Sequence, residues 1–179
     1  MFFQRRIMAS EDVKAYNRSV IFQNANVNAE ATNGAFVALR SPAVTIFSTN
    51  DKTTFIAATP SANTEAIYIL DIVESPYVTS GTNVFRVLDS IIDLKAPAGI
   101  AVRARKPKLD DLFELGSDNF ASSPTVGQFA IPTASSKLAT PVASIDTAKF
   151  CIKILESITK SIGVSSSLTV YLCQVVTAV

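Results

Sequence analysis

Short apolar runs alternate with clusters of turn residues along most of this sequence, and this alternation constrains the fold more than any other feature. The runs are rich in Val, Ile, Thr and Phe, and they are separated by Gly, Pro, Asn, Asp and Ser. Such a pattern is typical of β-strands joined by turns, because β-branched and aromatic side chains pack well on a pleated surface. From residue 33 onward it predicts strands over 35–39, 44–47, 53–57, 66–73, the first part of 84–94, 100–105, 126–131, 149–155 and 168–179.

Some of these segments carry further information. The run 66–73 is apolar on both faces, so we expect it to be a central strand. Arg103 and Arg105 fall on one face of their predicted strand, because successive side chains alternate between the faces. Mixed patterns indicate one helical turn at the end of 84–94 and either a short helix or a strand over 109–115.

The spacing of these elements favours one compact β-rich domain over residues 31–179. Turn and loop residues occupy 60–64, 75–83, 116–119 and 133–141. Many short strands at such intervals are typical of a closed barrel or a two-sheet sandwich. The predicted fold class is therefore mainly β, a single β-barrel or β-sandwich domain with short helical turns and an extended N-terminal arm.

Residues 1–30 differ in character from the rest and are predicted to form that arm. They contain Arg5 and Arg6 near the start and a polar stretch over 23–28. Only 19–22 has weak strand character, and no amphipathic helix is evident. Two interpretations stay open: an extended arm that becomes ordered on a neighbouring subunit, and a frayed terminus.

The composition indicates that part of the surface is covered by partners. Hydrophobic residues make up 48% of the chain and charged residues only 17%, against about 25% charged residues in a typical soluble domain. Apolar side chains in this proportion require either an unusually rich core or contacts with other subunits. We therefore expect an obligate assembly rather than a free monomer.

The charge distribution favours a protein partner over nucleic acid. The net charge is +1, so no overall field attracts the chain to a polyanion. A basic run near the middle lacks the interleaved aromatic residues that stack on bases, and it fits a contact with a partner or charge protection of a strand edge. The candidate partner-binding residues are Arg5, Arg6, Arg103, Arg105, Lys106 and Lys108.

The side chains needed for common catalytic sites are scarce. The chain has no histidine, which removes the commonest general base and the usual Ser and Cys triads. Its densest carboxylate cluster, Asp110, Asp111, Glu114 and Asp118, does not have calcium-loop spacing and follows two lysines. Ion pairing explains this cluster better than metal binding or catalysis, so we expect no enzymatic activity and no cofactor.

With no recognisable targeting segment in the sequence, we expect synthesis and assembly in a cytoplasm. Cys151 and Cys173 each lie in an apolar run, so we expect buried free thiols. The most apolar segment, 168–179, is shorter than the roughly 20 residues that cross a bilayer. The N-terminus has no continuous apolar region typical of a signal peptide. We therefore expect no membrane association.

Several short elements occur in an order that resembles a known group of viral proteins. They are an Asn-Gly-x-x-Val-x-Leu element at 33–39, a Thr-Pro loop within 57–64, an apolar strand over 67–76, a Gly-x-Phe strand at 127–129 and a Lys-Leu pair at 137–138. In this order they resemble the capsid cement, or decoration, proteins of tailed bacteriophages. The Asn-Gly and Thr-Pro pieces alone are ordinary turn chemistry, and the similarity lies in the order of the elements along the chain.

The resemblance implies a virion protein that binds the assembled capsid shell and stabilises it by bridging capsid subunits. Its partners would be the major capsid protein and copies of itself, with a trimer favoured, and it would be assembled into the virion in the host cytoplasm. A tail-tube, head-completion or minor capsid subunit is the first alternative. From another class, a β-sandwich module that binds carbohydrate or a host surface would use exposed aromatic residues, for which Tyr77 and Phe120 are the candidates.

Overall fold

The computed structural model describes residues 17–44, 54–61, 65–72, 77–80, 83–86, 95–136, 138–145, 147–162 and 166–178. Over these ranges the chain is built of strands, with one 3-10 turn at Ser117–Asn119. The predicted mainly β class is therefore confirmed. The strands are β1 (Asn17–Asn24), β2 (Val27–Asn28), β3 (Ala31–Thr32), β4 (Phe36–Val44), β5 (Thr54–Ala58), β6 (Ile67–Asp71), β7 (Tyr77–Ser80), β8 (Asn83–Arg86), β9 (Lys95–Ala96), β10 (Val102–Arg105), β11 (Leu112–Gly116), β12 (Phe129–Pro132), β13 (Ala139–Val142), β14 (Phe150–Ile162) and β15 (Ser166–Ala178).

Five of the first strands close into a barrel. Their order is β10-β6-β4-β5-β1, and β1 then pairs with β10 to complete the ring, while β2 extends the end of β1. The β1–β5 pair is parallel and the other pairs in the ring are antiparallel. The interior is filled by small and medium apolar side chains: Val20, Phe22, Val37, Ala57, Leu70, Val102 and Ala104.

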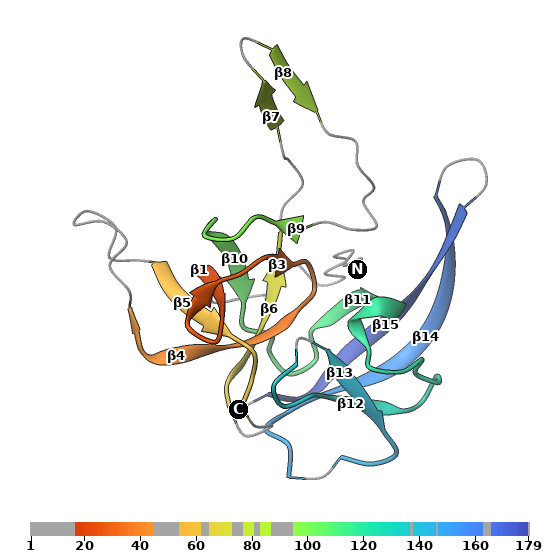
Figure 1. Ribbon diagram of the computed structural model, residues 1–179. Helices are drawn as coiled ribbons and strands as arrows, with labels where there is room; N and C mark the ends of the chain where they lie inside the picture. The colour runs from red at the N-terminus through yellow and green to blue at the C-terminus, as the bar shows by residue number, and fades with distance from the viewer. Residues whose placement is uncertain are drawn as a thin grey trace.

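The second half of the chain forms a five-stranded antiparallel sheet in the order β11-β15-β14-β12-β13. Figure 1 shows it beside the barrel, with the long β14–β15 hairpin projecting from the body of the molecule. A parallel bridge between Phe120 and Ala139 draws the chain after β11 toward β13 at the far edge of the sheet.

The barrel and the sheet share one hydrophobic core. Phe36 and Ile69 point out of the barrel and pack in the same cluster as Phe150 and Ile152 of β14. The rings of Phe36 and Phe150 have centroids 6.1 Å apart. Apolar side chains cover both faces of β4 and β6. The prediction that 66–73 contains a central strand is therefore confirmed, because a strand buried on both faces is apolar on both.

The N-terminal boundary was predicted wrongly in part. Residues 17–24 form β1, and its Val20 and Phe22 lie in the barrel interior, so this part of 1–30 belongs to the fold rather than to an arm. The local pattern around 19–22 was too short to show that β1 closes a ring. The rest of the predicted arm, residues 1–16, lies outside the described residues.

Some predicted loops contain strands. The range 75–83 includes β7 and the start of β8, which form a hairpin, and the range 133–141 includes most of β13. The ambiguous segment 109–115 contributes strand β11 rather than a helix. The predicted helical turn at the end of 84–94 lies outside the described residues.

Phe36→Ala is expected to destabilise the whole protein rather than the barrel alone. The deleted ring leaves a cavity in the shared core, which typically costs about 3–5 kcal/mol for a buried phenylalanine. Urea unfolding followed by far-ultraviolet circular dichroism should keep a single transition at a lower midpoint. As a control, Leu109→Ala removes an exposed side chain and should change the free energy of unfolding by less than about 0.5 kcal/mol. Two separated transitions in the wild-type protein would contradict a shared core.

Candidate interaction surface

The basic run lies where the chain leaves the barrel and enters the second sheet. Arg103 and Arg105 occupy the outer face of β10, while Val102 and Ala104 point into the barrel. Their predicted position on one face is confirmed. Since the strand buries its alternate residues, the two guanidinium groups are held side by side on the outside of the ring.

Both arginines bind the same carboxylate. Asp71 of β6 accepts from Arg103 Nη2 at 2.8 Å, and the Arg105 Nε–H donates to the same Asp71 Oδ2. The side chains of Arg103, Arg105 and Asp71 are 34%, 11% and 8% exposed. One carboxylate therefore offsets two guanidinium groups, and this cluster keeps an excess of positive charge on the barrel wall. Charge-assisted pairs of this kind are among the stronger hydrogen bonds in proteins.

One explanation of the basic run is charge protection of a strand edge. For Arg103 and Arg105 this explanation is wrong. Strand β10 is hydrogen-bonded to β6 on one side and to β1 on the other, so these residues are not on an edge. The reason is the closure of the barrel by β1, which the sequence alone had assigned to an arm. A contact with a partner stays a prediction for these residues.

Lys106 and Lys108 follow in the connection between the barrel and β11, where both are partly exposed. The Lys108 backbone N–H donates to Asp111 Oδ2 at 2.8 Å, which fixes the turn. The structure therefore places both lysines directly after the arginines of β10. Arg5 and Arg6, the other candidate partner-binding residues, lie outside the described residues.

The aspartates of the acidic cluster form hydrogen bonds within the fold. Asp111 caps its turn, and Asp110 Oδ1 accepts from Gln174 Nε2 at 3.1 Å. Asp118 is exposed and accepts from Ser117 Oγ at 3.4 Å. Within the part of the chain that the structure describes, no group of three or more potential metal ligands converges.

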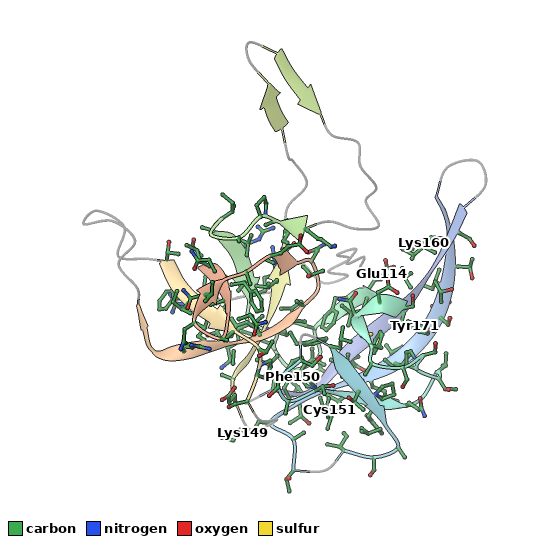
Figure 2. All side chains as sticks on the ribbon, viewed as in Figure 1. Glu114, Lys149, Phe150, Cys151, Lys160 and Tyr171 are labelled. Carbon is green, nitrogen blue, oxygen red and sulfur yellow. The ribbon has the colours of Figure 1, made fainter. Side chains whose placement is uncertain are left out.

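The fourth member of that cluster, Glu114, is almost completely buried and forms an ion pair with Lys160 of β14. Figure 2 shows Lys160 toward the distal end of the β14–β15 hairpin, whereas Glu114 comes from β11. The pair therefore connects the hairpin with the edge of its own sheet. A buried carboxylate needs such a partner, because leaving it unpaired in a low-dielectric environment is costly.

Cys151 and Cys173 are buried free thiols, as predicted. Burial raises the pKa of Cys151 to about 11. Burial, and to a smaller extent the negative charge of Glu114, also raises the pKa of Cys173. Both sulfurs therefore stay protonated at neutral pH, and each lies in the strand interior rather than on a reactive surface.

Phe120, one of the two aromatic candidates for a carbohydrate surface, is not on the surface. It is buried in the shared core, where its ring packs edge-on against Tyr171 with centroids 5.5 Å apart. The turn residues that precede it predicted exposure, but the bridge to Ala139 draws the ring inward. The side chain of Tyr77, the other candidate, is outside what the structure describes.

Sequence reasoning missed four exposed aliphatic side chains, two at each of two places where distant parts of the chain meet. Val27 and Ile100 are 68% and 54% exposed, and they flank the close approach of Asn28 to Gly99. Val126 and Leu155 are 52% and 36% exposed on turn and strand residues next to the Gly127–Ile154 hydrogen bond. Paired apolar side chains at a surface are typical of contact regions, although single ones are ordinary.

Comparisons with known proteins do not assign the chain to a family: no family model, curated protein or solved structure matches it. Among the described residues, no helix has the length and apolar character needed to cross a membrane.

Lys160→Met is expected to lower the free energy of unfolding by about 3–5 kcal/mol, because it leaves the Glu114 carboxylate buried without a partner. The double variant Glu114→Met/Lys160→Met should recover most of this loss, since it removes the uncompensated charge. Chemical denaturation of the wild type and both variants measures the effect. A Lys160→Met protein as stable as the wild type would show that the ion pair contributes nothing.

The two thiols predict a loss of stability at alkaline pH. Burial raises the pKa of Cys151 from the ordinary value of 9.0 to about 11 in the folded state. Below pH 9 the thiol is protonated in both the folded and the unfolded state, and its contribution to the free energy of unfolding is fully present. As pH rises from 9 toward 11, the unfolded chain releases the thiol proton while the folded protein keeps it. The free energy of unfolding should fall over that range, and less so in Cys151→Ala/Cys173→Ala. Equal pH profiles for the two proteins would refute this.

Proposed function

We propose that this chain is a non-enzymatic virion structural protein that binds an assembled capsid shell and stabilises it by bridging capsid subunits, as a cement or decoration protein does. Its partners in this proposal are the major capsid protein and copies of itself. A tail-tube, head-completion or minor capsid subunit is the same kind of molecule at another position, and it stays the first alternative.

The observation that supports this role best is the contrast between the interior and the surface. Carboxylates that could serve chemistry instead hold the fold together: Asp71 binds two arginines, Asp111 caps a turn and Glu114 binds Lys160. By contrast, paired aliphatic side chains are left in contact with solvent. Contact surfaces that combine apolar centres with surrounding charge are what subunit interfaces need.

The basic residues also support this role. Arg103 and Arg105 carry more positive charge than Asp71 offsets, and Lys106 and Lys108 extend this region toward the second sheet. Positive charge in such a position fits an acidic patch on a capsid subunit, which would orient the approach of the two proteins. The carbohydrate-binding alternative is less well supported, because Phe120 is buried.

The direct test is co-purification with particles. We expect the chain to migrate with gradient-purified virions of the virus that encodes it, at a fixed ratio to the major capsid protein. Its absence from such particles would refute the proposal. Labelling at the vertex that joins head and tail, rather than over the shell, would favour the head-completion alternative.

A charge reversal tests the basic region. Lys106→Glu should weaken rebinding of the purified protein to particles that lack it, and the weakening should diminish at high salt because exposed charge pairs are screened. Lys149→Glu is the matched control, since Lys149 is an exposed lysine on the segment before β14. Equal rebinding by the wild type and both variants would remove this region from the interface.

A further inference from the structure

The long hairpin has a strand edge that its own sheet leaves open. Strand β12 pairs with β14 only at Ile152 and Lys153, and Ile154 then exchanges hydrogen bonds with Gly127 and Gln128. Beyond that point, no strand in the described part of the chain pairs with this side of β14. The open edge, which we define as residues 156–162, is free of β12 and projects with the hairpin (Figure 1).

A β-bulge marks where the open edge begins. The register between β14 and β15 shifts between Ile154 and Glu156, so Leu155 is an extra residue in β14. Leu155 is exposed, and so is Val126, whose chain neighbour Gly127 donates its backbone N–H to the Ile154 carbonyl at 2.8 Å. Bulges interrupt the ladder and re-aim a side chain, and here that side chain is a leucine.

The sequence of the open edge is self-complementary in an antiparallel register centred on Ile158. In that register Glu156 opposes Lys160 of a second copy, Ser157 opposes Thr159, and Ile158 opposes itself. Opposite charges, hydroxyl pairs and apolar pairs directly across two strands are each stabilising. A twofold axis through Ile158 would repeat every favourable pair, which is what a contact between identical surfaces requires.

We propose that two copies of this chain associate through antiparallel pairing of their β14 open edges. The contact joins two hairpins into a four-stranded ribbon in the order β15-β14-β14-β15, and it gives hydrogen-bond partners to backbone groups of β14 with which no strand in the described part of the chain pairs. Its use in an assembly rests on the proposed structural role, but its existence does not. A twofold contact is also different from the trimer that the family resemblance favours.

The protective features common on edge strands do not block this contact. Bulges and lysines usually prevent edge-to-edge pairing. Here the bulge lies at the start of the open edge rather than within it, and the Lys160 ammonium is drawn toward Glu114 of its own chain. An ammonium has three donors, so Lys160 can keep Glu114 and still donate to Glu156 of the second copy.

Sedimentation velocity of the full-length protein tests the contact without any particle. We expect a concentration-dependent dimer, and Glu156→Lys should raise its dissociation constant about tenfold or more, because the introduced lysine then faces Lys160 of the other copy on both sides of the axis. Asp118→Lys is the matched control, with the same charge change at another exposed acidic residue, and should leave the dimer unchanged. A wild-type monomer at about 100 μM, far above the dissociation constant of a stable contact, or an equal effect of both variants would overturn the proposal.

Cysteine cross-linking tests the register. Residues directly opposite in an antiparallel pair have Cα atoms about 4.5–5.5 Å apart, within the range that a disulfide can bridge. Ile158→Cys should therefore yield a covalent dimer with copper-phenanthroline as oxidant. Ser167→Cys, exposed on β15 of the same hairpin, should not, because three strand spacings of about 4.8 Å would separate the two copies. Equal cross-linking of both variants would contradict the register.

These results separate the two proposals. A dimer through Ile158 in a protein that does not bind particles would retain the edge contact and refute the virion role. A protein that binds particles but stays monomeric, with no cross-link at position 158, would retain the virion role and refute the edge contact.

Discussion

The wall made by β4 and β6 belongs both to the barrel and to the core between the barrel and the second sheet. One face of this wall, with Phe36 and Ile69, packs on the second sheet, and the other, with Val37 and Leu70, fills the barrel. Neither half can be removed without exposing buried apolar surface, and each buried large side chain contributes about 1.5–3 kcal/mol. The barrel and the sheet are therefore parts of one folding unit.

Ion pairs among the described residues also hold this arrangement together. Asp71 binds Arg103 and Arg105 on the barrel wall, and Glu114 binds Lys160 across the second sheet. Such pairs hold elements in register when both partners are present. A basic region, several exposed aliphatic side chains and an open strand edge lie at the surface of the described part of the chain, and the proposed role in assembly rests on them.

Sequence reasoning predicted the fold class and the alternation of individual strands well. The alternation of Arg103 and Arg105 with Val102 and Ala104 was visible because a half-buried strand has a period of two. Closure by β1 was missed, since ring closure depends on pairing between residues far apart in the chain. The bulge at Leu155 was missed for the same reason: an extra residue in one strand is defined only by its partner strand. The role of the basic run was misjudged where it depended on β10 being an edge.

We expect apolar and backbone groups at the surface of the isolated chain to become covered in an assembly. Amide hydrogen exchange on the free protein and on particles that carry it tests this most directly, because exchange reports whether backbone groups are protected. On particles we expect slower exchange over residues 155–162, and over 97–101 around the exposed Ile100. Identical exchange over both segments in the free and assembled protein would contradict it.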